Sequence, residues 1–219
     1  MTARRRPADA VARTTAAYAR QADAFLKRWG RRITRCPALL RELLALAGPR
    51  AALLDLGCGA GQDARFLLAR RHHVVGHVVG HVVGLDHTWP LLAYARRRSR
   101  RVPLVHGDMR ALPFRPGSFD AIWAAASLIH LTKPAVPRLL RALRAQVPVG
   151  GLLAATVAHG RRAGYLRTGW IPGRYFARWR RPELERAVIR AGWTVVSLET
   201  VIGRERKGRW LNLLARRAR

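Results

Sequence analysis

The segment DLGCGAG, residues 55–61, constrains the fold more than any other part of this 219-residue sequence. It continues an apolar run that starts at residue 52, and such a run ending in an acid and glycines is typical of a buried strand entering a tight turn. Glycines in a turn adopt backbone angles that a Cβ would obstruct, and they let the backbone approach a ligand closely. The segment therefore predicts a ligand-binding turn at the carboxyl end of a strand.

The spacing of these glycines distinguishes two kinds of ligand. A dinucleotide-binding loop has the pattern G-x-G-x-x-G, which would require glycine at position 62, where the chain has Gln62. The pattern present is D-x-G-x-G-x-G. Asp55, at the mouth of the strand, suits the cationic end of a ligand better than a phosphate, so the spacing disfavours a dinucleotide.

Predicted strands and helices alternate along the rest of the chain. The strands are expected at residues 52–57, at the segment ending in Asp86, and at residues 102–108, 119–125, 152–158, 194–200 and 209–217. Helices are expected between them, and such alternation predicts an α/β fold whose sheet is mostly parallel and covered by helices on both faces. Because only a short turn joins the last two of the seven strands, we expect the last strand to be antiparallel.

The chain has 42 lysines and arginines against 12 acidic residues, which gives a formal net charge of +30. A charge of this size attracts polyanions, at least non-specifically and at low salt. The arginines are dispersed along the chain, and clusters such as residues 96–101 form no recognisable nucleic-acid-binding module. We therefore expect a basic, solvated surface with non-specific affinity for nucleic acid.

The composition also bounds the class of protein. Apolar residues make up 49% of the chain, which argues against a disordered protein, and no apolar stretch reaches the ~18 residues of a membrane span. The basic start of the chain lacks the apolar core of a secretory signal, and two cysteines, Cys36 and Cys58, suit a reducing cytosol. We expect a cytoplasmic protein with a basic, partly disordered arm (residues 1–20) and a single domain (residues 21–219).

Several motifs, taken in order, resemble those of the class I S-adenosylmethionine-dependent methyltransferases. They are the glycine segment, GLDH at residues 84–87, HGDMRALPF at 106–114, FRPGSFDAIWAAASLIHL at 114–131 and VPVGGLLAATV at 147–157. The resemblance is closest over residues 50–158. It implies a Rossmann-like, doubly wound fold, S-adenosyl-L-methionine as the cofactor and methyl transfer as the reaction.

The resemblance also implies which residues bind the amino-acid and ribose parts of the cofactor. Asp55, Gly57, Gly59 and Gly61 of the glycine segment would hold the amino-acid part. Asp86, at the end of the second strand, would bind the ribose hydroxyls.

Four further residues complete the implied cofactor site. Asp108 would bind the adenine amino group, and the backbone of Met109 would support the ring. Ala125 ends the fourth strand beside the cofactor. Tyr18 is similar to an aromatic residue that closes over the cofactor from the amino-terminal helix, and packing in the core is its alternative role.

Two features of the sequence concern the acceptor. His130 follows the fourth strand, where the acceptor pocket is expected, and its intrinsic pKa suits a general base; the alternative is that it only packs or hydrogen-bonds there. Residues 160–180 form an insert in which aromatic residues and arginines are interleaved. This insert would either cover a small substrate as a lid or stack on nucleic-acid bases.

The word HVVG occurs three times in succession, at residues 73–76, 77–80 and 81–84. It lengthens the interval between the glycine segment and Asp86 beyond the family's usual spacing by about two copies. We interpret the stretch as one strand, formed by the last copy, preceded by two tandem copies in the connection. A shift of four residues is even and keeps the same side chains facing the core, so deleting two copies is expected to leave a foldable chain.

The repeat also raises the alternative of a metal site formed by His73, His77 and His81. These imidazoles are flanked by glycine and valine rather than by further ligands of the usual metal-binding sets. We therefore predict no metal site.

Taken together, these features predict a methyltransferase that acts on a small-molecule acceptor, which the sequence does not identify. The net charge suggests an RNA methyltransferase as the alternative enzyme, although the fourth strand ends in WAA rather than in the Asn/Asp-Pro-Pro-aromatic signature used for base nitrogens. The non-enzyme alternative is a basic binding protein that retains the cofactor fold without turnover.

Overall fold

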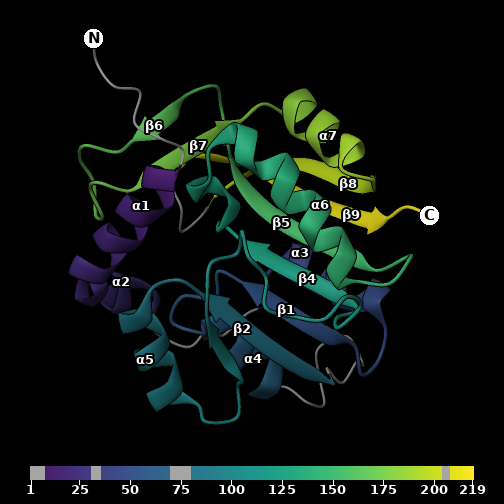
Figure 1. Ribbon diagram of the computed structural model, residues 1–219, viewed down its shortest axis with the longest axis horizontal. Helices are drawn as coiled ribbons and strands as arrows, with labels where there is room; N and C mark the ends of the chain where they lie inside the picture. The colour runs from purple at the N-terminus through teal and green to yellow at the C-terminus, as the bar shows by residue number, and fades with distance from the viewer. Residues whose placement is uncertain (1–7, 31–35, 70–79, 204–207) are drawn as a thin grey trace.

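The computed structural model describes residues 8–30, 36–69, 80–203 and 208–219. A nine-stranded sheet runs through it in the order β3-β2-β1-β4-β5-β7-β6, with β9 on β5 and β8 on β9 (Figure 1). The strands are β1 (Ala52–Leu56), β2 (His81–Asp86), β3 (Leu104–His106), β4 (Ala121–Ala125), β5 (Leu152–His159), β6 (Ala163–Tyr165), β7 (Tyr175–Trp179), β8 (Trp193–Ile202) and β9 (Arg209–Arg217).

The first five strands are mutually parallel, and β9 is antiparallel to both β5 and β8. The chain order reverses between β1 and β4, which are adjacent in the sheet. In doubly wound folds, ligands bind beyond the carboxyl ends of the strands at this point. The predicted α/β class and the antiparallel last strand are confirmed.

Helices cover both faces of the sheet (Figure 1). They are α1 (Ala8–Arg20), α2 (Ala22–Trp29), α3 (Ala38–Ala47), α4 (Gln62–Ala69), α5 (Trp89–Arg98), α6 (Val136–Gln146) and α7 (Arg181–Arg190). On one face Leu140 and Leu143 of α6 share an apolar cluster with Val188 of α7. On the other, Leu40 of α3 and Phe66 of α4 belong to a second cluster. Each cluster includes strand residues, so burial of these helix faces holds the layers together.

The insert contains two strands that the sequence did not predict. β6 and β7 pair in an antiparallel hairpin, and β7 also pairs in parallel with Ala158 and His159 at the end of β5. Because Ala158 pairs with β9 on its other edge, β7 occupies the edge of β5 beyond the end of β4 at Ala125. The hairpin therefore lies at the carboxyl end of the sheet, where a ligand is expected.

Of the expected arm at residues 1–20, the structure describes residues 8–20, which form α1 (Ala8–Arg20) and pack on the domain. Ala10, Thr14 and Ala17 lie on one face of α1 and are at most 5% exposed. The Thr14 hydroxyl accepts a hydrogen bond from the backbone amide of Tyr175 in β7 (2.9 Å). The sequence did not reveal this buried face, because its side chains are small rather than strongly apolar and basic residues lie between them.

The third HVVG copy forms the start of β2, as predicted. His81 pairs with Ala52, and the register continues to Leu85 opposite Leu56. His81 is exposed at the start of the strand, whereas His73 and His77 lie outside the described residues. In the part of the chain that the structure describes, no helix is both long and apolar enough to cross a membrane.

Candidate active site

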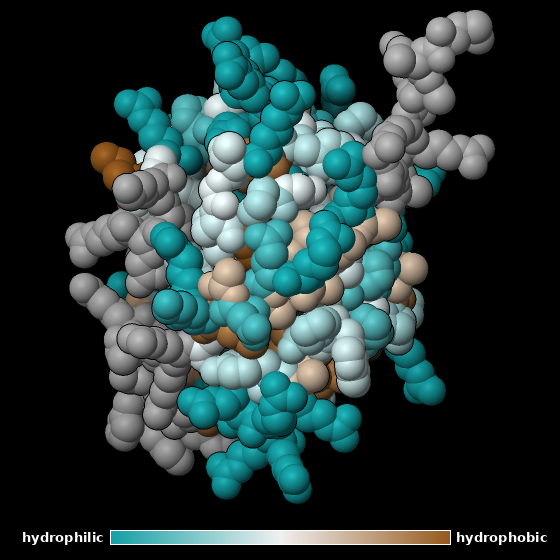
Figure 2. Space-filling model, turned by 90° about the vertical axis from the view of Figure 1, so that its left-hand side faces the viewer, coloured by the Kyte–Doolittle hydropathy of each residue, from teal (hydrophilic) through white to brown (hydrophobic). Residues whose placement is uncertain are grey.

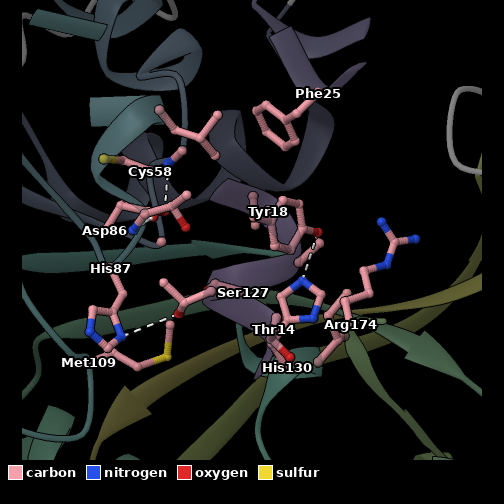
Figure 3. Close-up of a pocket in the computed structure, with 18 of the residues that line it drawn as sticks. Thr14, Tyr18, Phe25, Cys58, Asp86, His87, Met109, Ser127, His130 and Arg174 are labelled. Atoms are coloured by element: carbon pink, nitrogen blue, oxygen red, sulfur yellow. Dashed lines mark hydrogen bonds between the residues drawn. The ribbon is translucent and has the colours of Figure 1, made fainter. Parts of the chain in front are cut away.

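A cavity of about 540 Å³ lies beyond the carboxyl ends of β1, β2 and β4. The glycine segment and the ends of β2 and β4 line one part of it, and α1, α2 and the insert line the rest. Figure 3 shows Cys58, Asp86 and Met109 on one side of this pocket and Tyr18 and His130 on the other. The face formed by α1, α2 and α5 is mostly hydrophilic, with small apolar patches between the polar side chains (Figure 2).

The glycine segment bends tightly at the mouth of β1. Gly57, Gly59 and Gly61 all have positive φ, at 77°, 53° and 68°. A Cβ on Gly57 would lie 2.4 Å from the Cβ of Ser127, and one on Gly59 would lie 3.2 Å from the ring of Phe25. Gly57 and Gly59 line the cavity, whereas Gly61 packs against Ala95 below it. The glycines thus shape a backbone cradle that side chains would fill.

Asp86, the last residue of β2, is hydrogen-bonded to the glycine segment. Its Oδ2 accepts a hydrogen bond from the amide of Gly59 (2.8 Å), and its Oδ1 accepts one from the amide of Thr88 (2.7 Å). Burial raises the pKa of this carboxyl, and the two amide hydrogen bonds oppose part of the rise. The Thr88 side chain also bonds to this carboxyl. Since the two carboxylate oxygens together offer about four acceptor sites, Asp86 can still accept a hydrogen bond from a ligand in the cavity.

Asp55 lies beneath the cradle rather than in it. Its side chain is 3% exposed, its Oδ2 has no hydrogen-bond partner among the described residues, and it is absent from the cavity wall. Burial, and then the charges of Asp63 and Asp86, hold the pKa of Asp55 well above its usual range. Asp55 therefore contacts the glycine segment from below.

Asp108 also lies outside the cavity wall, although its neighbours Gly107 and Met109 line the cavity. Both carboxylate oxygens of Asp108 accept hydrogen bonds from the Arg110 guanidinium. Burial raises the pKa of Asp108, but these bonds outweigh that effect and leave the pKa below its usual value. Met109 thus lines the cavity, whereas the Asp108 side chain does not.

Tyr18 of α1 and His130 of the turn after β4 meet on the same side of the cavity (Figure 3). The Tyr18 hydroxyl lies 3.0 Å from His130 Nε2, and His130 Nδ1 lies 2.8 Å from the carbonyl oxygen of Tyr175. Both residues line the cavity, as does Ala125 at the end of β4. The sequence predicted each of these residues separately, but not the contact between Tyr18 and His130.

The turn after β4 contains strained backbone that the sequence did not reveal. Ala126 has a φ of 59°, a region that residues other than glycine rarely adopt. Its neighbour Ser127 is 5% exposed, and the Ser127 hydroxyl has no hydrogen-bond partner among the described residues. Both residues line the cavity. Strain of this kind is concentrated at functional sites.

The cover over the cavity consists of α1, α2 and the insert, which contact one another. Gln21 donates a hydrogen bond from Nε2 to the Pro172 carbonyl (3.1 Å), and Phe25 stacks on Trp170 at 5.9 Å between ring centroids. Trp29 and Arg28 also line the cavity. The sequence analysis did not predict a role for these α2 residues. The aromatic and basic residues just before Gly30 could have indicated one.

Comparison with known proteins agrees with this architecture. Residues 53–151 match a family model described as a methyltransferase domain. Malonyl-[acyl-carrier protein] O-methyltransferase from Legionella pneumophila is 30% identical over 130 residues, which cover 57% of this chain and 42% of that protein. An 18S rRNA (guanine-N(7))-methyltransferase from Mus musculus is 38% identical over 81 residues, 36% of this chain and 26% of that protein. The chain thus matches less than half the length of these curated relatives.

A similar solved structure is that of 1,6-didemethyltoxoflavin-N1-methyltransferase from Burkholderia thailandensis, with bound 1,6-didemethyltoxoflavin and S-adenosylhomocysteine. The likeness has a TM-score of 0.68 at 21% identity and covers 97% of this chain and 89% of that one. At this identity the likeness supports the fold alone. The matched domain model, the fold and the order of the motifs agree with the resemblance noted in the sequence. Residues 53–151 thus match a methyltransferase domain, and the fold and the motif order of the chain are similar to those of the class I S-adenosylmethionine-dependent methyltransferases.

Proposed function

We propose that this protein transfers a methyl group from S-adenosyl-L-methionine to a small-molecule acceptor. One observation carries the proposal: a single cavity joins the glycine cradle and Asp86 to a chamber lined by aromatic residues and His130. Its volume of about 540 Å³ lies within the ~300–1,000 Å³ of small-molecule sites.

The residues present fit the cofactor. Gly57 and Gly59 form a cradle in which a Cβ would meet Ser127 or Phe25. Ser127 Oγ and Gln62 Oε1 are buried at the cavity wall without hydrogen-bond partners among the described residues. Such groups are satisfied when a polar ligand binds.

In this proposal, Asp86 accepts hydrogen bonds from the ribose hydroxyls, and the backbone of the glycine segment holds the amino-acid part. Met109 lies against the adenine ring. When bound, the cofactor supplies an electrophilic methyl group on a sulfonium. The surrounding residues contribute by aligning the acceptor and by excluding water, which together supply much of the catalysis for an in-line displacement.

His130 is the proposed general base for acceptors that lose a proton. The Tyr175 carbonyl only accepts hydrogen bonds, so it fixes Nδ1 as the protonated nitrogen and leaves the lone pair of Nε2 facing the cavity. Tyr18 donates to that lone pair and holds the ring in place. An acceptor hydroxyl or amine that displaces Tyr18 would lose its proton to Nε2.

The packing of the insert supports a small acceptor over RNA. Phe176 and Trp179 are buried at 9% and 2% exposure, and Trp170 lines the cavity. A stacking platform for bases displays its aromatic rings on the surface, whereas these rings pack inward as a cover. The net charge of +30 keeps an RNA acceptor as the alternative to be tested. Because two cysteines, Cys36 and Cys58, are too few for a disulfide framework, we propose the cytoplasm as the location.

Two experiments test the proposal. Calorimetry measures binding of S-adenosylhomocysteine, and an assay with S-adenosyl-L-methionine carrying a tritiated methyl group measures transfer of the label to a small-molecule cell extract and to RNA. We expect micromolar cofactor binding and label in the small-molecule fraction. Label recovered in RNA would favour the RNA alternative. Cofactor binding without transfer to either fraction would favour the non-catalytic binding protein, and absence of cofactor binding would reject all three.

A further inference from the structure

Arg174, which precedes β7 in the insert, is a buried cation in the wall of the cavity. It is 7% exposed, and its Nε and Nη1 atoms have no hydrogen-bond partner among the described residues. The ion pairs of the described residues, Arg110 with Asp108 and Lys133 with Glu183, do not include it. A buried guanidinium is ordinarily paired with an anion or a set of acceptors, so this arrangement is unusual.

The surroundings of Arg174 stabilise its charge without using its N–H groups. The guanidinium carbon lies 4.7 Å from the centroid of the Trp170 ring, 5.7 Å from that of Phe176 and 5.9 Å from that of Tyr18. Aromatic faces attract a cation through the ring quadrupole, but they leave the N–H groups of Nε and Nη1 without acceptors among the described residues. The planar N–H fork of arginine matches the geometry of a carboxylate.

Acidic and basic side chains lie on different sides of the cavity. The acidic side chain in its wall, Asp86, lies with Met109 on the side opposite Tyr18, His130 and Arg174 (Figure 3). Arg28 and Arg178 line the cavity in addition to Arg174. A cavity that concentrates cations at one end favours a negatively charged ligand there.

We propose that Arg174 determines acceptor specificity by binding a carboxylate of the acceptor, whose carbon skeleton lies among Trp170, Phe176 and Tyr18. This inference rests on the proposed function, and it narrows the acceptor to an organic acid. The amino-acid part of the cofactor also carries a carboxylate, so the experiment must separate these two sources of the same group.

The acceptor arm of the experiment uses matched ligand pairs. Three carboxylates, benzoate, 4-hydroxycinnamate and octanoate, are titrated beside their neutral amides, with and without saturating S-adenosylhomocysteine. The proteins are the wild type, Arg174→Gln and, as a control at an exposed arginine, Arg186→Gln. We expect at least one acid to bind the wild type and the control about tenfold more tightly than its amide, equivalent to about 1.4 kcal/mol. Arg174→Gln should remove this preference. Equal affinities for every pair in the wild type, or an unchanged preference in Arg174→Gln, would overturn the proposal.

The cofactor arm compares S-adenosylhomocysteine with 5′-methylthioadenosine, which lacks the amino-acid part. We expect Arg174→Gln to leave the ratio of the two affinities unchanged. A loss confined to S-adenosylhomocysteine would assign Arg174 to the cofactor carboxylate and overturn the acceptor assignment. Failure of the wild type to bind either nucleoside would reject the proposed function alone, because the acid and amide titrations without nucleoside still test Arg174.

A third measurement separates ligand binding from a structural role. Arg174→Met keeps an unbranched, apolar stem but removes the guanidinium and its charge. In the ligand-free protein we expect this variant to melt at the same temperature as the wild type or higher. A clear fall in melting temperature would show that Arg174 supports the folded state and would overturn its assignment as a specificity residue.

Discussion

The hydroxyl of Tyr18 lies 3.0 Å from Nε2 of His130, although 112 residues separate the two in the sequence. The contact joins the amino-terminal helix α1 to the turn after β4 in the wall of the cavity. His130 is also bound through Nδ1 to the Tyr175 carbonyl. The ring is therefore held from two sides, by α1 and by the insert.

The first prediction concerns the proton on His130. Because the Tyr175 carbonyl accepts from Nδ1, the neutral imidazole should be protonated at Nδ1 and unprotonated at Nε2. Two-bond ¹H–¹⁵N spectra of histidine-labelled protein report this tautomer directly. Tyr18→Phe should preserve it, since the bond to Tyr175 remains. A dominant Nε2-protonated form would contradict the geometry and would remove His130 as the proposed base.

The second prediction tests the glycine cradle. A Cβ on Gly57 would lie 2.4 Å from the Cβ of Ser127, so Gly57→Ala should displace the turn and weaken S-adenosylhomocysteine binding at least tenfold. Gly117 is a matched control because its φ of 70° resembles the 77° of Gly57, but a Cβ added to it would meet nothing within 4 Å. Gly117→Ala should therefore show the cost of positive φ alone, about 1 kcal/mol of stability, with unchanged cofactor affinity. Equal losses of affinity in the two variants would argue against the cradle.

The third prediction compares Asp86 and Asp108, two aspartates that the family resemblance assigns to cofactor binding. Asp86→Ala removes a charged acceptor from the cavity wall and from the Gly59 amide, so we expect cofactor binding to weaken by about 1–3 kcal/mol. Asp108 is bonded to Arg110 outside the wall, so Asp108→Ala should weaken binding less. Calorimetry of both variants decides, and a larger loss for Asp108→Ala would mean that the adenine lies where its carboxylate reaches.

The sequence predicted the sheet well because its strands are marked by local patterns. The runs that end at Asp86 and Ala125 were identified as short, mostly apolar segments, and the first of them contains β-branched residues and ends in an acid. The same patterns placed Gly57, Gly59 and Met109 at one end of the sheet. These features depend on residues close together in the chain.

The cover of the cavity could not be predicted in the same way, since its contacts are remote in the sequence. The hydrogen bond from the Tyr175 amide to Thr14 spans 161 residues, and β6 has three residues, too few for a periodic signal. Nothing distinguishes Arg174 from the other arginines of the insert in the sequence. Its significance follows from burial and missing partners, which only the fold reveals.

The fourth prediction concerns pH. The pKa of Asp55 is raised by burial and by the charges of Asp63 and Asp86. A carboxyl whose pKa is raised on folding stabilises the protein at low pH, and this stabilisation is lost as the pH rises through the folded-state pKa. In the ligand-free protein, Asp55→Asn should therefore melt a few degrees higher than the wild type at pH 7.5, where about 1 kcal/mol shifts the melting temperature by about 2–4 °C. The difference should shrink toward pH 5.

Asp108 is the control for this pH dependence, because its pKa is lowered by the Arg110 hydrogen bonds despite burial. Its contribution is present above the unfolded-state pKa and is lost as the pH falls, so Asp108→Asn should not melt higher than the wild type at pH 7.5. Thermal unfolding of the three proteins from pH 5 to 7.5 gives the comparison. A lower melting temperature for Asp55→Asn at pH 7.5 would reverse the predicted sign.

The last prediction concerns the HVVG repeat and refines the expectation drawn from the sequence. Gly80, the residue before β2, donates a hydrogen bond to the Ala51 carbonyl (3.1 Å). A Cβ at this position would lie 2.2 Å from the carbonyl oxygen of Arg50. Deleting residues 73–80 joins His72 directly to β2 and places a side chain at this position. Deleting residues 72–79 removes the same number of residues but retains Gly80. Both deletions shorten the connection, which changes the loop-closure free energy by only a few tenths of a kcal/mol.

We therefore expect the variant lacking residues 72–79 to fold, to bind S-adenosylhomocysteine like the parent and to melt at the same temperature or higher. The variant lacking residues 73–80 should be less stable by about 1–3 kcal/mol, the usual cost of forcing an extra side chain into a packed position. Differential scanning calorimetry of the parent and the two deletion variants decides. If the deletion of residues 72–79 unfolded the protein, the first two copies would be part of the working structure, and the interpretation of the repeat as one strand with two tandem copies would be wrong.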